Sequence, residues 1–298
     1  MVSHLFVLAF DDPTSLMRSF FGVEGTPTDD EVARARTAEG VILEGLQQAL
    51  RDGAPAPPAA VLIDPTYGLG AIVSARAAGI RVALPLEVSG RDELELSLRD
   101  WKGQLTELDP TWASVLIRYN PDGDETARRA QRSKLRAVAQ RCRDTGRGFM
   151  VELLVPPLPA QLAAADGDRA RYDAEVRPAL VARAIEEIRK DEIGPNVWQV
   201  EGVDRTEDCT IIAEAAASPC IVVARTDDRD TVDRWLRAAA PASGFIGFAI
   251  GRPIWEVPLR SFLEAGASRE ATVEAIGAAY RRCVDIYEAG STPALRST

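Results

Sequence analysis

Short apolar stretches alternate with amphipathic stretches along most of the chain. Each apolar stretch is rich in Val, Ile, Leu or Phe, and most of them end at or beside a polar residue or glycine. This pattern is typical of strands that are buried on both faces. The eight stretches are residues 5–11 (LFVLAFD), 60–64 (AVLID), 80–87 (IRVALPLE), 114–120 (SVLIRYN), 148–155 (GFMVELLV), 197–202 (VWQVEG), 220–224 (CIVVA) and 244–250 (GFIGFAI).

Helical periodicity is found between these stretches. Thr28-Asp29-Asp30-Glu31 resembles a capping box and predicts a helix that continues through residues 32–50. Further helices are predicted at residues 70–78, near Trp101, and at 125–144, 172–190, 206–217, 230–240 and 269–289. Asp11-Asp12-Pro13 is interpreted as a break, and the Pro-rich segments 52–58 and 155–159 as loops within one domain.

Eight strands that alternate with helices predict an α/β protein built from parallel βα units. Eight is also the number that closes a barrel, so we expect a (β/α)8 TIM barrel in which residues 1–298 form a single domain. A doubly wound open sheet is the alternative. No G-x-G-x-x-G motif follows the first strand, which favours the barrel.

Polar residues end most of the predicted strands, and in a barrel these positions surround the active site. They are Asp11, Asp64, Glu87, Arg118 with Asn120, Glu152, Glu201, Arg225 and Gly251 with Arg252. Converging acids raise one another's pKa values, which suits acid–base catalysis. Alternatively, some of these acids form structural ion pairs with Arg118 or Arg225. Glu152 and Glu201 favour a functional role because each interrupts an apolar strand.

Gly251-Arg252 follows the last strand, where barrels often bind phosphate through backbone N–H groups. Glycine permits close approach, and an arginine fork can hold phosphate oxygens. The alternative is an ordinary surface arginine. Arg118, Asn120, Arg225, Asp64 and Glu87 are expected to contact the rest of the ligand, and possible partners include a second copy of the chain.

Composition narrows the classes of function. The net charge of −10 argues against a nucleic-acid partner, and the chain has no apolar run of about 18 residues that would span a membrane. The N-terminus lacks the features of a signal peptide. The four cysteines are far apart, which indicates reduced thiols in a cytoplasmic protein.

Several catalytic mechanisms lack the side chains that they need. The only lysines, Lys102, Lys134 and Lys190, fall in predicted helices, so none is placed to act as an amine nucleophile. His4 is the only histidine and precedes the first strand, at the end of the barrel opposite the expected site. These positions exclude a His-rich metal site and a Ser-His or Cys-His pair. No cofactor is required, and Mg²⁺ or Mn²⁺ held by the strand-end carboxylates is the one metal option.

The chain also resembles a known family. The resemblance is carried by residues 5–11 (LFVLAFD), 118–121 (RYNP), 152–157 (ELLVPP), 197–202 (VWQVEG) and 244–252 (GFIGFAIGR). These stretches resemble the aldolase-like barrel that some bacteria fuse to 5-dehydro-2-deoxygluconokinase of inositol breakdown. They are more distantly similar to the class I tagatose-bisphosphate aldolases. The resemblance covers nearly the whole chain and implies a barrel that cleaves a phosphorylated sugar through a lysine imine.

The resemblance also assigns roles and reveals departures. Asp11, Glu152 and Arg252 match family positions for substrate contact, acid–base support and phosphate binding. The Schiff-base lysine of the sixth strand is replaced by Gln199, and a further family lysine by Val88. The family's Asp-His-Arg after the first strand is Asp11-Asp12-Pro13 here. An amide cannot form an imine, although Gln199 can hydrogen-bond a substrate oxygen.

Two hypotheses follow. The first is an aldolase-like enzyme, a carbon–carbon lyase or a related isomerase or dehydratase, that acts on a phosphorylated or anionic sugar or polyol without an imine. Glu152 and Glu201 would be its acid and base, Asp11 would orient hydroxyl groups, and Arg118 and Arg252 would hold the anion. The second is a catalytically inactive homologue that binds a sugar phosphate or stabilises a partner protein.

Overall fold

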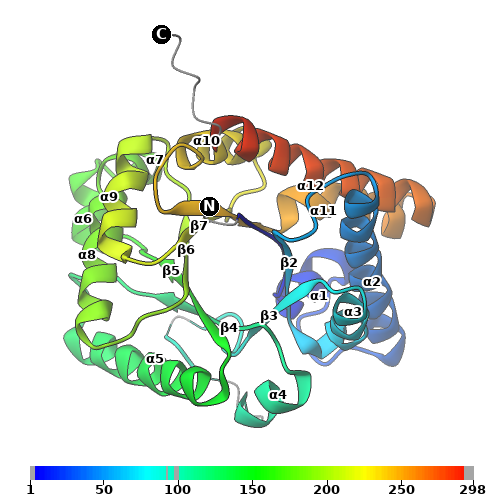
Figure 1. Cartoon of the computed structure of the whole chain (residues 1–298), viewed down its shortest axis with the longest axis horizontal. Helices are drawn as coiled ribbons and strands as arrows, with labels where there is room; N and C mark the ends of the chain where they lie inside the picture. Colours follow the sequence, from blue (N-terminus) through cyan, green and yellow to red (C-terminus); the bar gives the residue numbers. More distant parts are fainter. Residues whose placement is uncertain (1–3, 92, 97–100, 292–298) are drawn as a thin grey trace.

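Eight parallel strands form a closed barrel in the computed structural model, which describes residues 4–91, 93–96 and 101–291 (Figure 1). Each strand pairs with the next, and β8 pairs with β1 to close the ring. The strands are β1 (Leu5–Phe10), β2 (Ala59–Ile63), β3 (Arg81–Pro85), β4 (Trp112–Arg118), β5 (Gly148–Leu154), β6 (Val197–Glu201), β7 (Cys220–Val223) and β8 (Phe245–Ile250). The predicted (β/α)8 fold is confirmed.

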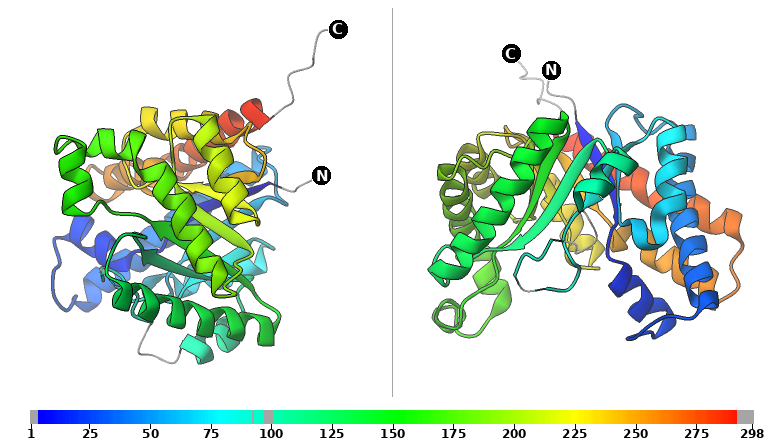
Figure 2. Two further views of the ribbon diagram at one scale, coloured as in Figure 1. Left: turned by 90° about the vertical axis from the view of Figure 1, so that its left-hand side faces the viewer. Right: turned by 90° about the horizontal axis from the view of Figure 1, so that it is seen from below.

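Helices surround the barrel on all sides, as Figures 1 and 2 show. They are α1 (Pro13–Phe21), α2 (Asp29–Arg51), α3 (Pro65–Ala77), α4 (Trp101–Leu108), α5 (Glu125–Thr145), α6 (Pro159–Ala164), α7 (Arg169–Glu175), α8 (Arg177–Lys190), α9 (Thr206–Ala216), α10 (Arg229–Ala239), α11 (Arg252–Glu264) and α12 (Arg269–Ser291). Within the described residues, none of these helices combines the length and the apolar character that crossing a membrane requires. Residues 1–3 of the N-terminal stretch and residues 97–100 next to the helix predicted near Trp101 lie outside the described part.

Proline explains most differences from the predicted helices. Helices α1, α6 and α11 were not predicted; Asp11-Asp12-Pro13 was interpreted as a break, and all three helices have proline in the first turn. Proline is tolerated in the first turn of a helix, where its missing N–H has no helical partner. Pro65 likewise starts α3 earlier than expected, and Pro178 starts α8, so that the single helix predicted at 172–190 is two helices.

Side chains along each strand alternate between the inside of the barrel and the layer beneath the helices. Leu5 and Val7 belong to the apolar cluster inside the barrel, and the same alternation turns Asp11 inward. Met150 belongs to that cluster too, so Glu152 also faces inward. The other inward-facing residues at the strand ends are Asp64, Glu87, Arg118, Gln199 and Arg225. Strand register therefore directs polar side chains into one end of the barrel.

Helix α12 packs along α2 and joins the end of the fold to its beginning. The two helices approach closely at Gly45, where a Cβ atom would lie 2.3 Å from Cγ2 of Ile276. The hydroxyl of Tyr280 on α12 donates a hydrogen bond of 2.9 Å to the carbonyl of Phe6 in β1. His4 lies at this same amino-terminal end of β1, packed on Phe6, as the sequence predicted.

Candidate active site

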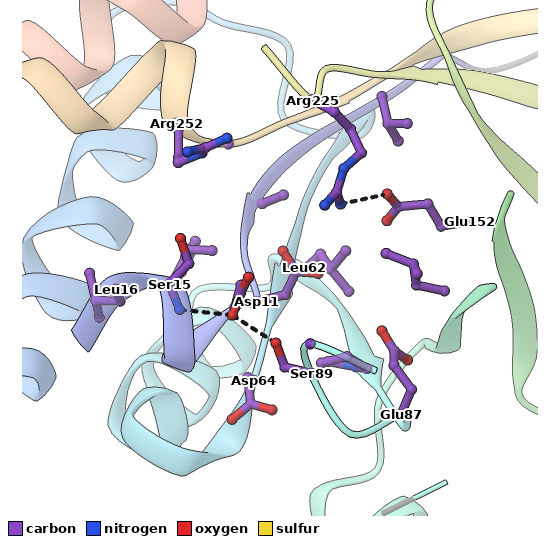
Figure 3. A pocket seen from close by; sticks show the side chains of 18 of the residues that line it. Asp11, Ser15, Leu16, Leu62, Asp64, Glu87, Ser89, Glu152, Arg225 and Arg252 are labelled. Atoms are coloured by element: carbon purple, nitrogen blue, oxygen red, sulfur yellow. Dashed lines mark hydrogen bonds and ion pairs between the residues drawn. The ribbon is translucent and has the colours of Figure 1, made fainter. Parts of the chain in front are cut away.

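A cavity of about 260 Å³ opens at the carboxyl ends of the strands (Figure 3). Nine of the eleven residues predicted for the site line it: Asp11, Asp64, Glu87, Arg118, Glu152, Gln199, Arg225, Gly251 and Arg252. In Figure 3, Arg225 and Arg252 lie on one side of the cavity, and Asp64 and Glu87 lie on the opposite side. The fold therefore gathers acids and arginines around one space.

Two predicted residues have other partners and do not line the cavity. The carboxylate of Glu201 lies 3.5 Å from the guanidinium of Arg177, a buried residue of α8. Arg177 also donates hydrogen bonds to the carbonyls of Glu201 and Gly202. The side-chain amide of Asn120 donates to the Pro156 carbonyl and to Gln161. Both residues support the ends of their strands, which differs from the expectation that they contact the ligand.

Burial and mutual repulsion favour the neutral forms of the acids. Burial raises the pKa of Glu87 to about 8, and the nearby Glu152 contributes to this shift. The pKa of Asp11 is raised well above its usual range, first by burial and then by Glu152 and Glu87. Burial also raises the pKa of Asp64, although its bonds to Thr66 oppose the shift. The cavity therefore holds fewer negative charges than it has carboxyl groups.

Glu152 differs from the other acids because it has an arginine partner. Its carboxylate lies 3.4 Å from the guanidinium of Arg225, as the dashed line in Figure 3 shows. Burial raises the pKa of Glu152, and the charge of Arg225 opposes that shift. Arg225 thus lowers the pKa of Glu152, although burial leaves that pKa raised overall. Glu152 and Glu87 therefore lie in different electrostatic environments, as an acid and a base in one site usually do.

Arg252 and Arg118 also line the cavity, from opposite sides of the barrel. Arg252 occupies the first turn of α11, and its guanidinium lies 3.4 Å from the exposed carboxylate of Asp227. The positive end of the α11 dipole lies here, although Pro253 has no N–H and the N–H of Ile254 donates to the carbonyl of Gly251. Across the cavity, Arg118 donates a 2.6 Å hydrogen bond to the carbonyl of Arg91. Arg252 therefore gives its side of the cavity a positive charge.

Gln199 lies at the bottom of the cavity and is almost completely buried. Its amide nitrogen donates a 2.8 Å hydrogen bond to the hydroxyl of Ser114 in β4, and its Oε1 atom has no partner. All three lysines belong to the described part of the chain, and none lines the cavity. Lys134, for example, donates to the carbonyl of Leu94. The site therefore contains no amine that can form an imine with a substrate.

Polar residues that were not predicted for the site also line the cavity, among them Glu39, Asp12 and Ser89. Glu39 reaches the cavity from α2, in a stripe of buried residues that includes Ala35, Ala38 and Ile42. A charged residue inside an apolar helical stripe is a sequence signal that could have identified it. Asp12 accepts hydrogen bonds from the backbone of Ser15 and from the hydroxyl of Ser89, which joins α1 to the loop after β3. No comparable sequence signal pointed to Ser89.

Metal ligands are a separate question. Within residues 4–91, 93–96 and 101–291, no three His, Cys, Asp or Glu side chains are grouped so that they could hold a metal ion. The Mg²⁺ or Mn²⁺ site at the carboxylates stays a prediction from the sequence.

Fold and cavity together define a (β/α)8 barrel with an acid-rich and arginine-rich mouth. The chain belongs to the family described as "Uncharacterized protein conserved in bacteria (DUF2090)", whose model matches residues 1–291. No match to a curated protein is found.

Solved structures share the fold at low sequence identity. An archaeal fructose 1,6-bisphosphate aldolase is 13% identical, with 97% of this chain and 95% of that chain covered and a TM-score of 0.60. A Schiff-base-forming fructose-1,6-bisphosphate aldolase is also 13% identical, with 94% of each chain covered and a TM-score of 0.58. Cgl0159 from Corynebacterium glutamicum (Brevibacterium flavum) is 14% identical, with 94% and 86% covered and a TM-score of 0.57.

Proposed function

We propose that the protein is a cytoplasmic aldolase-like enzyme that acts on a phosphorylated or otherwise anionic sugar or polyol. The reaction is a carbon–carbon cleavage, or a related isomerisation or dehydration, without a lysine imine. The observation that supports this proposal most is the Glu152–Arg225 pair beside Glu87 in one cavity. The four cysteines are free and buried, which supports placement in a reducing compartment.

The proposed chemistry assigns a base and an acid. Arg225 opposes the burial that raises the pKa of Glu152, which suits Glu152 as the base, whereas burial raises the pKa of Glu87 to about 8, so that Glu87 is mostly protonated at pH 7. In a retro-aldol step, Glu152 removes the proton of the β-hydroxyl group, the carbon–carbon bond breaks, and its electron pair moves onto the substrate carbonyl. Glu87 then delivers a proton to that oxygen and gives a neutral enol. Glu201 has no role in this step because Arg177 holds it outside the cavity.

Anion binding follows from the arrangement of Arg252 and α11. The guanidinium of Arg252 provides donors for a phosphate, and the positive end of the α11 dipole favours its negative charge. Arg225 lies between Arg252 and Glu152 in Figure 3. A substrate with its phosphate at Arg252 would therefore extend its carbon chain toward the acids. Asp11 lines the same path and would orient hydroxyl groups.

The test is turnover of a panel of sugar phosphates, including fructose 1,6-bisphosphate and fructose 6-phosphate, with product detection by mass spectrometry. We expect at least one substrate to be converted and Glu152→Gln to reduce the rate by about 10² to 10⁴-fold. Parallel reactions with EDTA or added Mg²⁺ or Mn²⁺ test the metal prediction. Surface variant Glu274→Gln is the matched control, because that glutamate is exposed on α12.

The presence of glutamine at position 199 supports a second candidate function. Because the register of the imine lysine holds an amide, the barrel is alternatively a catalytically inactive sugar-phosphate sensor or a partner-stabilising subunit. Binding without turnover across the whole panel would support this candidate and contradict the enzyme.

A further inference from the structure

Glu39 is a buried acid that the proposed chemistry does not use. Its residue surface is only 2% exposed, yet it lines the cavity. Its Oε2 atom has no hydrogen-bond partner. Gly68 of α3 leaves room for this carboxyl, because a Cβ atom there would lie 2.4 Å from Oε2. A buried polar atom without a partner is rare in folded proteins, so its place beside a cavity calls for a ligand.

We propose that Glu39 is a substrate-binding residue that recognises a hydroxyl group in the deep part of the cavity. This inference rests on the proposed function and narrows its substrate class to polyhydroxylated phosphates, as opposed to small anions. The anionic group would stay at Arg252, and the hydroxyl-bearing carbons would extend toward Glu39.

The chemistry of the carboxyl supports a hydroxyl partner. Burial, with Asp64 and Asp11 nearby, raises the pKa of Glu39 to about 9. The group is therefore a neutral carboxylic acid at pH 7, with one O–H donor and free acceptor lone pairs. A hydroxyl group matches it because it also donates and accepts. A second anion would gain nothing from a carboxyl group placed among other acids.

Two other unsatisfied oxygens point to the same kind of ligand. Oε2 of Glu87 and Oε1 of Gln199 also lack partners, and both residues line this cavity. With Glu39 they provide three separate polar atoms around about 260 Å³, which is enough space for several carbon atoms and their hydroxyl groups. A ligand with several hydroxyl groups therefore matches this lining better than a ligand with one.

Binding measurements separate this inference from the proposed function. Isothermal titration of the wild type with inorganic phosphate, glycerol 3-phosphate, fructose 6-phosphate and fructose 1,6-bisphosphate compares ligands that share an anionic group and differ in hydroxyl groups. The same titrations are made with Glu39→Leu, which removes the carboxyl, and with Glu39→Gln, which keeps a donor and an acceptor. Glu274→Gln serves as the surface control.

We expect at least one polyol phosphate to bind the wild type more tightly than inorganic phosphate. Glu39→Leu should weaken that ligand by about five- to tenfold and change phosphate affinity less than twofold. Glu39→Gln should retain most of the affinity, and it keeps the test valid if the leucine variant does not fold. Two results would overturn the role of Glu39 and leave the proposed function standing. One is an equal loss of affinity for the polyol phosphate and for inorganic phosphate in Glu39→Leu, and the other is a wild type that does not prefer polyol phosphates to inorganic phosphate. Failure of every ligand to bind the wild type would overturn the proposed function as well.

Discussion

Replacing Glu39 with glutamine should change how stability depends on pH. The pKa of this carboxyl is raised by burial from 4.5 to about 9 in the folded protein. Between these values the folded state holds a proton that the unfolded state has released. The stabilising contribution of protonation is therefore complete below pH 4.5 and is lost as the pH rises toward 9.

The size of the effect follows from the shift. Each pKa unit corresponds to about 1.4 kcal/mol, so keeping Glu39 protonated at pH 7 lowers the stability of the wild type by about 3 kcal/mol. Glutamine has a similar shape and needs no proton. The free energy of unfolding of Glu39→Gln should therefore exceed that of the wild type by a margin that widens by about 3 kcal/mol from pH 5.5 to pH 8.

Urea denaturation at several pH values, followed by tryptophan fluorescence, measures this margin. The other cavity acids titrate in both proteins, so their contributions largely cancel in the difference. Glu274→Gln, a substitution at an exposed position of α12, is the surface control. A constant margin for Glu39→Gln would refute the reasoning that this carboxyl is buried and neutral.

Three further predictions use the same cavity. Gly68→Ala should lower stability by about 1–3 kcal/mol in denaturation experiments because its Cβ overlaps neighbouring side chains, whereas Gly70→Ala, with open space around it, should not. Borohydride should trap no adduct of the wild type with fructose 1,6-bisphosphate, and Gln199→Lys should restore trapping detectable by mass spectrometry; a wild-type adduct would contradict the assignment of the lysines. Arg252→Ala should weaken phosphate binding by about tenfold or more in calorimetric titration, and an unchanged affinity would place the anion elsewhere.

Strand register made much of the site predictable from the sequence. If residues 5–11 form a strand whose alternate side chains face the inside of the barrel, Asp11 must lie at the cavity. The same reasoning holds for Glu152. The position of Glu201 could not be predicted in this way. Its partner Arg177 belongs to α8, and the local sequence of β6 does not indicate that an arginine of this helix contacts Glu201.

The helices that begin with proline show a different limit. Pro13 and Pro253 are compatible with either a chain break or the first turn of a helix, and only the packing of the following residues decides between them. Glu39 was missed for a related reason, since a search of strand ends does not examine the inner face of a helix. Buried acids in apolar helical stripes are therefore a useful addition to such a search.

The close packing of α12 on α2 has a consequence for biosynthesis. Helix α2 emerges early from the ribosome, but the partner that covers Gly45 and the neighbouring turn emerges only after all eight strands. Contacts between segments so distant in sequence form late. Part of the apolar surface of α2 therefore stays exposed until α12 has been synthesised. Nascent chains that stall before α12 should therefore recruit chaperones.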